Sequence, residues 1–194
     1  MRWDSLFDDL ESQLERERTA EELDLEAEEE RLRLGRLAIR DRLLALAAAP
    51  GERPVRIALA GGVRILVHPH TIGRDWLSAA MPDGRQCVVP LASIASVSLS
   101  QVEVATSLGA ADPSSGPRDT VSGRLGLPFV LRDLCRRRRQ VEVTTTDGAL
   151  VGTIDRVGRD HLDLAVHEAG TARRESSVRD VVMVPIGRIV IVRA

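Results

Sequence analysis

The chain has 194 residues, of which 43 % are hydrophobic and only 2 % aromatic, so an aliphatic core can support one large domain or two small ones. No apolar run reaches the roughly 18 residues that a membrane span needs, and the acidic N-terminus is unlike a secretory signal. The net charge is −2, and Cys87 and Cys135 are too few for a disulfide framework, so we expect a cytoplasmic protein without a membrane partner.

The N-terminal segment is strongly acidic. Residues 1–30 carry 13 acidic and 3 basic side chains, a net charge of −10 that leaves +8 on the remainder of the chain. Leucine spacing predicts helix from residue 3 to about residue 47, with a break near Thr19 and a coiled coil as one arrangement. Residues 1–36 are therefore interpreted as an acidic helical arm that binds a basic partner or folds back onto its own body.

The arm carries an apolar stripe on one helical face. This stripe is a candidate partner-docking surface of the helix-in-groove type, and packing against the rest of the chain explains it equally well. Its residues are Trp3, Leu6, Phe7, Leu10 and Leu14.

Short β-branched runs predict strands after Pro50-Gly51 ends the helical pattern. Gly61-Gly62 predicts a tight hairpin, because glycine accepts a positive φ. Pro69 predicts a strand end or a sheet edge, because proline donates no hydrogen bond to a ladder. The first set of expected strands is Val55–Leu59, Val63–Val67, Trp76–Met81, Gln86–Val89 and Ile94–Leu99.

A Pro-, Gly- and Ser-rich stretch then predicts a linker at residues 109–126. Pro128 can open a helix that carries Phe129 to about Arg138. A second set of strands is expected from Val141 to Val192.

One pattern occurs twice along the chain. Gly73-Arg74-Asp75 and Gly158-Arg159-Asp160 each precede a strand, and each is followed by a Val-Pro-aliphatic corner, at Val89-Pro90-Leu91 and Val184-Pro185-Ile186. With the turn glycine before and the β-branched strand after, four landmarks recur in one order, which indicates an internal duplication. The aspartate of each turn is expected to cap backbone N–H groups with the arginine in solvent, rather than to act as a catalytic acid.

The second copy has a turn glycine at Gly148, a bulge glycine at Gly152 and an aliphatic-x-aliphatic strand at Leu162-Asp163-Leu164. Together with a helix followed by five short strands, this pattern resembles the Sm-like fold of the Sm, Lsm and Hfq superfamily. The resemblance covers roughly residues 37–105 and 127–194. It implies a mainly β fold with helices, in which two tandem Sm-like or SH3-like five-stranded barrels, residues 37–108 and 127–194, are each preceded by a helix and joined to the long acidic N-terminal helix. The segments that carry it are Asp147-Gly148, Gly152-Thr153-Ile154, Leu162-Asp163-Leu164 and Val184-Pro185-Ile186-Gly187-Arg188-Ile189.

Catalytic motifs are not apparent in the sequence. There is no Ser-His-Asp order, phosphate loop or paired-Cys motif, so we expect a protein that is not an enzyme and has no cofactor. His68 and His70 flank Pro69 and could bind zinc together with Cys87 or Cys135, but zinc sites need three or four ligands at recognisable spacing. An exposed strand end is the simpler interpretation, and we expect no metal site.

The densest positive patch precedes the second set of strands. Such patches supply non-specific nucleic-acid affinity, and pairing with the acidic arm is the other interpretation. The strands contain no Tyr or Phe on which a base could stack. The patch consists of Arg132, Arg136, Arg137, Arg138 and Arg139.

These observations favour a non-enzymatic binding or scaffold protein. Its barrels are expected to associate through strand edges, and its acidic arm to dock a protein partner or its own basic face. A homo-oligomer is one form that this association can take. The alternative is an RNA- or DNA-binding regulator that uses the arginine patch, with the acidic arm as a competing cover.

Overall fold

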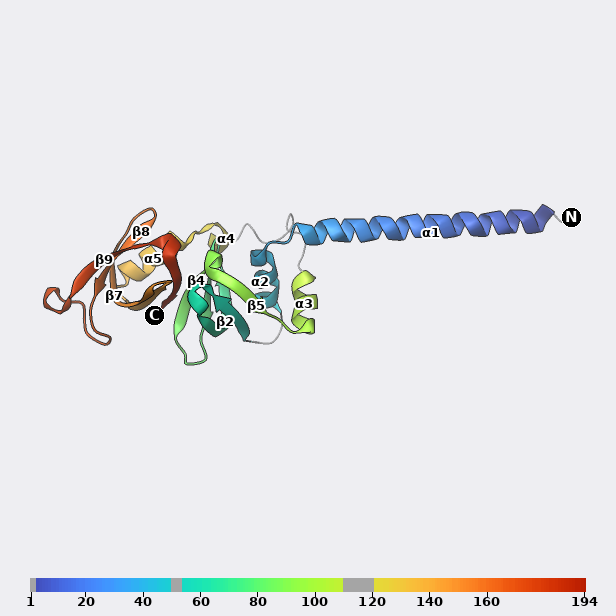
Figure 1. Cartoon of the computed structure of the whole chain (residues 1–194). Coiled ribbons are helices and arrows are strands. Elements are labelled where there is room, and N and C mark those ends of the chain that lie inside the picture. Colours follow the sequence, from blue (N-terminus) through green and yellow to red (C-terminus); the bar gives the residue numbers. More distant parts are fainter. Residues whose placement is uncertain (1–2, 50–53, 110–120) are drawn as a thin grey trace. The chain divides into compact units, whose positions relative to one another are not determined.

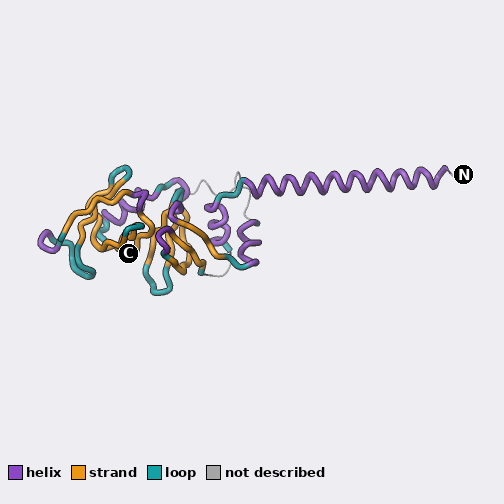
Figure 2. The backbone as a smooth tube through the Cα atoms, in the orientation of Figure 1, coloured by secondary structure: helices purple, strands orange, loops and turns teal. Residues whose placement is uncertain are grey.

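The computed structural model describes residues 3–49, 54–109 and 121–194, and it gives only the backbone for residues 3–12, 17 and 20. The chain divides into two units, Met1–Ala38 and Ile39–Ala194. Five α-helices and ten strands lie in the described residues (Figure 1, Figure 2).

The first unit is one continuous helix, α1 (Trp3–Gly35), as Figure 1 shows. The predicted break near Thr19 is wrong, because the Thr19 hydroxyl donates to the Glu15 carbonyl oxygen at 2.8 Å within the helix. The helical stretch predicted from residue 3 to about residue 47 is instead divided into two helices. Helix α1 ends at Gly35, a residue type that commonly terminates helices, and a separate helix α2 (Ile39–Ala48) follows.

The second unit contains α2, all ten strands and three further helices. The helices are α3 (Gln101–Leu108), α4 (Val121–Arg124) and α5 (Leu127–Arg136). The first five strands are β1 (Val55–Leu59), β2 (Arg64–Ile72), β3 (Trp76–Ala80), β4 (Gln86–Pro90) and β5 (Ile94–Ser98). The last five are β6 (Gln140–Thr145), β7 (Gly148–Val157), β8 (His161–Val166), β9 (Asp180–Pro185) and β10 (Ile189–Arg193). Most of the predicted linker, residues 110–120, lies outside the described residues.

All ten strands form one open antiparallel sheet, in the order β5-β1-β2-β3-β4-β10-β6-β7-β8-β9. The prediction of two closed five-stranded barrels is therefore wrong. The physical reason is β10, which pairs with β6 along one edge and with β4 along the other, and so joins the two sets of strands. We call residues 39–108 the first half, residues 127–194 the second half, and the β4–β10 pairing the seam.

The second strand corrects another prediction. Pro69 lies inside β2, between β1 and β3, and not at a strand end or a sheet edge. The pairing with β3 shifts register between Pro69 and Thr71, which marks a bulge or irregularity of the kind that accommodates a proline within a sheet. Up to Val67 the strand pairs with β1, and from His68 onward it pairs with β3.

Two buried aliphatic clusters support the sheet, and β10 contributes to both. Val190 and Ile191 pack with the residues of the first half, whereas Ile189 and Val192 pack with those of the second. In the opposite direction, Val88 of β4 belongs to the cluster of the second half. The two halves therefore share buried residues across the seam and do not have independent cores.

The two halves repeat the same local structure. Read in the same direction across the sheet, β5-β1-β2-β3-β4 and β10-β6-β7-β8-β9 have the same order. The Gly73 N–H donates to the Trp76 carbonyl at 2.8 Å, and the Gly158 N–H donates to the His161 carbonyl at 2.8 Å. Each Val-Pro corner leads into a short 3₁₀ turn before the last strand of its half.

An arginine from the helix of each half holds the corresponding turn. Arg40 Nε of α2 donates to the Gly73 carbonyl oxygen at 2.7 Å. Arg132 Nη2 of α5 donates to the Gly158 carbonyl oxygen at 3.1 Å. The two halves therefore use corresponding residues for the same contact, which supports treating α2 and α5, and β1–β5 and β6–β10, as equivalent.

Candidate functional site at the edges of the sheet

The seam shows how strands of this protein join edge to edge. Val88 of β4 lies opposite Val192 of β10, and Cys87 lies opposite Arg193. Beyond one end of this ladder, the Gln86 and Ala194 backbones exchange hydrogen bonds of 3.3 and 2.9 Å. The seam buries its apolar side chains, so that Val88 is only 8 % exposed.

Side-chain contacts reinforce the seam. The Ser93 hydroxyl is buried 2.8 Å from the carbonyl oxygens of both Pro90 and Val190, so it links the corner of the first half to β10. Arg193 Nη1 donates to Glu142 Oε1 at 2.5 Å, and Arg85 Nη1 approaches Glu142 Oε2 at 4.0 Å from the other side of the seam. Opposite charges therefore face each other across the joined strands.

The Gly-Arg-Asp turn of the first half binds the segment that leads into the second half. Trp76 Nε1 and the Arg74 N–H donate to the Leu125 carbonyl oxygen at 2.9 and 3.1 Å. The Leu127 N–H, the first of helix α5, donates to Asp75 Oδ1 at 2.7 Å. The expected capping role of the aspartate is thus met by a helix 52 residues away, where a carboxylate also suits the helix dipole.

The corresponding turn of the second half has no such cover among the described residues. The Asp160 side chain is 85 % exposed, compared with 47 % for Asp75, and its Oδ1 lies 2.8 Å from Nδ1 of the adjacent His161. This hydrogen bond from the imidazole lowers the pKa of Asp160. The aspartate of the turn is therefore partly covered in the first half, at Asp75, and exposed in the second half, at Asp160.

The two outer strands of the sheet each have one neighbouring strand in the part of the chain that the structure describes. β5 pairs with β1, and β9 pairs with β8. On β9, Val181 and Met183 alternate on one face and are 59 % and 66 % exposed. A long exposed edge with apolar side chains is a template for pairing with another strand.

The repeat assigns a counterpart to each residue of the seam. Counting back from the matched Val-Pro pairs, Met183 of β9 corresponds to Val88 of β4. Counting forward from the first residue of β5 and of β10, Val97 corresponds to Val192. The outer edges β9 and β5 are therefore the counterparts of the two strands that form the seam.

Two charged residues of the seam, Arg85 and Glu142, have counterparts of opposite sign. Asp180 on β9 corresponds to Arg85 by the same count. Arg56 lies opposite Ser98 in the β1–β5 ladder, as Glu142 lies opposite Arg193 in the β6–β10 ladder, so Arg56 corresponds to Glu142. Ser98 stands opposite Arg56, and no acidic residue in the described part of the chain forms an ion pair with Arg56.

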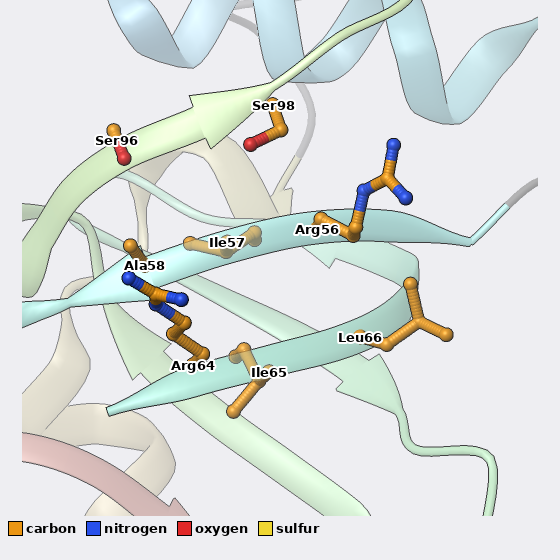
Figure 3. Close-up of a pocket in the computed structure, with 8 residues that line it drawn as sticks. All are labelled: Arg56, Ile57, Ala58, Arg64, Ile65, Leu66, Ser96 and Ser98. Carbon is orange, nitrogen blue, oxygen red and sulfur yellow. The ribbon is translucent and has the colours of Figure 1, made fainter. Parts of the chain in front are cut away.

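Arg56 also borders an open cavity of about 600 Å³ on the outer face of β5, β1 and β2. Figure 3 shows Arg56 and Arg64 on the neighbouring strands β1 and β2, with Ser96 and Ser98 above them on β5. The exposed Leu66 adds an apolar surface to this cavity. This face can therefore meet an acidic group that approaches along β5.

A smaller cavity of about 170 Å³ lies beside β5, and apolar side chains form most of its lining. Val97 lies on its sheet side, and Leu43 and Leu46 lie on its helix side. In the second half, the counterpart position is filled, since Val88 belongs to the same buried cluster as Leu131 and Val192. The complete lining is Ile39, Arg42, Leu43, Leu46, Val97 and Leu99.

The arginine patch predicted for nucleic acid is occupied largely by internal contacts. Arg136 and Arg137 bind Asp133 at 2.5 and 2.6 Å, and their hydrogen bonds, with that of Arg137 the larger cause, lower the pKa of Asp133. Arg132 holds the Gly158 carbonyl, as described above. Arg139 is exposed and directly precedes β6.

Arg138 takes part in a second network around Asp155. Arg173 binds Asp155 through two hydrogen bonds of 3.0 and 2.6 Å, and Arg138 Nη1 adds a third of 3.0 Å. The hydrogen bond from Arg173 is the largest cause of the lowered pKa of Asp155. These carboxylates explain most of the patch by internal pairing.

The remaining predicted residues are not brought together in a site. The side chains of Trp3, Leu6, Phe7 and Leu10 lie outside the described ones, and Leu14 of α1 is 58 % exposed. Along β2, His68 is half-buried and His70 is exposed. Among the described residues, no group of three or more His, Cys, Asp or Glu side chains is placed to hold a metal ion.

The two cysteines differ in their surroundings, which gives a direct test of the seam. Burial raises the pKa of the Cys87 thiol to about 11, whereas the Cys135 thiol is partly exposed and lies 3.4 Å from the Asp155 carbonyl. At pH 8 only about one Cys87 thiol in a thousand is ionised. We expect a thiol reagent to modify Cys87 only after unfolding, as measured by mass spectrometry, and rapid labelling of native Cys87 would contradict the buried seam.

Comparisons with known proteins do not assign this chain to a family. No family model matches the chain, and neither a curated protein nor a solved structure matches it. These comparisons do not identify the Sm-like superfamily. Within the described residues, none of the helices has the length and apolar character required to cross a membrane.

The residues at the sheet edges were missed by the sequence interpretation. Arg56 was interpreted as an outward-facing strand residue, and Asp180 as the end of a polar loop, although the structure places Asp180 in β9. Met183 was not singled out. A signal was nevertheless present. Aligning the two copies residue by residue shows the exchange of charge between Arg85 and Asp180.

Proposed function

We propose that the protein is a non-enzymatic scaffold of the cytoplasm that associates through the open edges of its sheet. The observation that supports this proposal is the seam, in which β4 and β10 pair by the same kind of edge contact that β9 and β5 leave available. A scaffold requires surfaces that bind without chemistry, and the exposed Val181 and Met183 give one edge an apolar surface. The acidic helix α1 is proposed as a second docking element for a protein partner.

The alternative of RNA or DNA binding has weaker support. Arg136, Arg137 and Arg138 already contact carboxylates of the same chain, so phosphate binding would have to break those ion pairs. An exposed ion pair is worth only about 0–1 kcal/mol, so the pairs oppose nucleic acid weakly. For the sheet edges, by contrast, the pairing of β4 with β10 in the seam offers a template.

The proposal predicts that the purified full-length chain is larger than a monomer in solution. A single chain has a mass of 21.2 kDa, so sedimentation velocity at increasing protein concentration should show species of at least twice that mass. Treatment with nuclease should leave the mass unchanged, because strand pairing needs no nucleic acid. If the protein sediments with the mass of a single chain at every concentration up to its solubility limit, it does not self-associate, and the proposed function is rejected.

A further inference from the structure

We infer that the partner of each open edge is a second copy of this chain, added head to tail, with β9 of one copy pairing antiparallel with β5 of the next. This inference rests on the proposed function and specifies which edges associate. Every chain contains both edges needed to repeat the seam, since β9 is the counterpart of β4 and β5 is the counterpart of β10. The seam therefore serves as the template for the contact between copies.

The template fixes the register of the contact. Within the chain, Val88 lies opposite Val192. Substituting the counterparts places Met183 of one copy opposite Val97 of the next. Continuing the antiparallel ladder by one position places Val182 opposite Ser98, where the seam has Cys87 opposite Arg193.

The cavity beside β5 supplies a site for Met183. The counterparts of Leu131 and Val192, which pack in one cluster with Val88, are Ile39 and Val97. Both of these residues line the cavity of about 170 Å³. Met183, the counterpart of Val88, would enter this cavity from the neighbouring copy, and an unbranched methionine adapts well to an irregular apolar space.

Charge complementarity supports the same arrangement. The Arg85–Glu142 approach across the seam becomes Asp180 of one copy against Arg56 of the next, so both signs are exchanged and the attraction is retained. Arg85 is replaced by the acidic Asp180 and Glu142 by the basic Arg56, so the two changes of charge compensate each other. In the described part of the chain neither Asp180 nor Arg56 forms an ion pair, so both are available to a neighbour.

The contact joins two different surfaces and is therefore heterologous. After two copies associate, one β9 edge and one β5 edge still remain open at the ends. A heterologous contact continues into a closed ring or an open filament. The inference thus predicts assemblies larger than a dimer.

A charge exchange tests the ion pair in the full-length protein. Arg56→Glu alone and Asp180→Arg alone should each weaken association about tenfold, because attraction is replaced by repulsion between exposed charges. The double variant Arg56→Glu/Asp180→Arg should recover association to within about threefold of the wild type, since the pair is restored with its signs reversed. Arg64→Glu is the matched control, because it makes the same charge change on the same face and is not the counterpart of a seam residue.

A truncation tests the apolar contact independently. Met183→Ala should weaken association about tenfold through the loss of buried apolar surface. Phe129→Ala is its control, because it removes a larger side chain that is 53 % exposed on α5, a helix that packs on the interior strand β7. Association constants would be measured by sedimentation, and circular dichroism would confirm that each variant is folded.

The outcomes separate this inference from the proposed function. If the wild type is a monomer, the proposed function fails. If the wild type associates but the double variant remains as weak as the single variants, or if Met183→Ala has no effect, head-to-tail pairing is overturned while self-association through another surface stands. Rescue by the double variant, together with assemblies larger than a dimer, would support the inference.

Discussion

Replacing Gly152 with alanine is expected to lower the stability of the sheet by about 3 kcal/mol, because the new methyl group overpacks a rigid part of the structure. A Cβ at this position would lie 2.2 Å from the Ala165 carbonyl oxygen and 2.9 Å from its carbonyl carbon. Both atoms belong to the backbone of β8, which pairs with β7 at this point. The clash can therefore be relieved only by separating two hydrogen-bonded strands.

The second half offers a matched control for this change. Gly187→Ala adds the same methyl group where no atom lies within 4 Å, so its midpoint of denaturant unfolding should remain close to that of the wild type. Urea unfolding of both variants, followed by circular dichroism, would measure the difference. Equal midpoints for the two variants would show that β7 and β8 are not as close as the structure places them.

Replacing Ile191 with alanine is expected to cost about 3–4 kcal/mol, because it leaves a cavity in a fully buried site. Ile191 lies on β10 but packs in the core cluster of the first half, and its side chain is not exposed. The loss should therefore weaken the sheet on both sides of the seam. We expect one cooperative unfolding transition whose midpoint shifts as a whole.

Val102→Ala is the control for this prediction, because Val102 is exposed on α3 and its truncation should change stability by less than about 0.5 kcal/mol. Differential scanning calorimetry would record the number of transitions as well as their midpoints. Two separate transitions in the wild type, with only one of them moved by Ile191→Ala, would show that the halves fold independently and would contradict a shared core.

The sequence predicted the elements of this fold far better than their assembly. The first strand was predicted with its observed bounds, Val55–Leu59, and the turn at Gly61-Gly62 has φ values of 70° and 77° as expected. These features depend on local backbone preferences and on the alternation of apolar residues. The choice of edge partner depends on residues far apart in the chain, and so the closed barrels were predicted wrongly.

One signal of the continuous sheet was nevertheless present. Ile189–Arg193 begins with four consecutive apolar residues, a pattern typical of a strand buried on both faces, and four of its five residues are buried. Its counterpart Ile94–Ser98 contains two serines, and none of its residues is buried. The difference between the two copies indicated that one strand is central and the other peripheral.

The candidate site was predicted less completely. The aspartate of the first turn does cap backbone, but its partner, the Leu127 N–H, belongs to a helix that local spacing does not connect to it. The arginine patch was recognised from its density, whereas its carboxylate partner Asp155 lies on β7 and became apparent only from the fold. Sequence patterns find charged residues, and tertiary contacts determine which of them are already paired.

The position of β10 has a consequence for the synthesis of this protein. It is the tenth strand to leave the ribosome, yet it is the sixth across the sheet, between β4 and β6. The nascent chain must therefore carry two unsatisfied strand edges until residues 189–193 emerge. A product that terminates prematurely before Ile189 would leave both edges permanently exposed, and we expect it to be degraded or to aggregate.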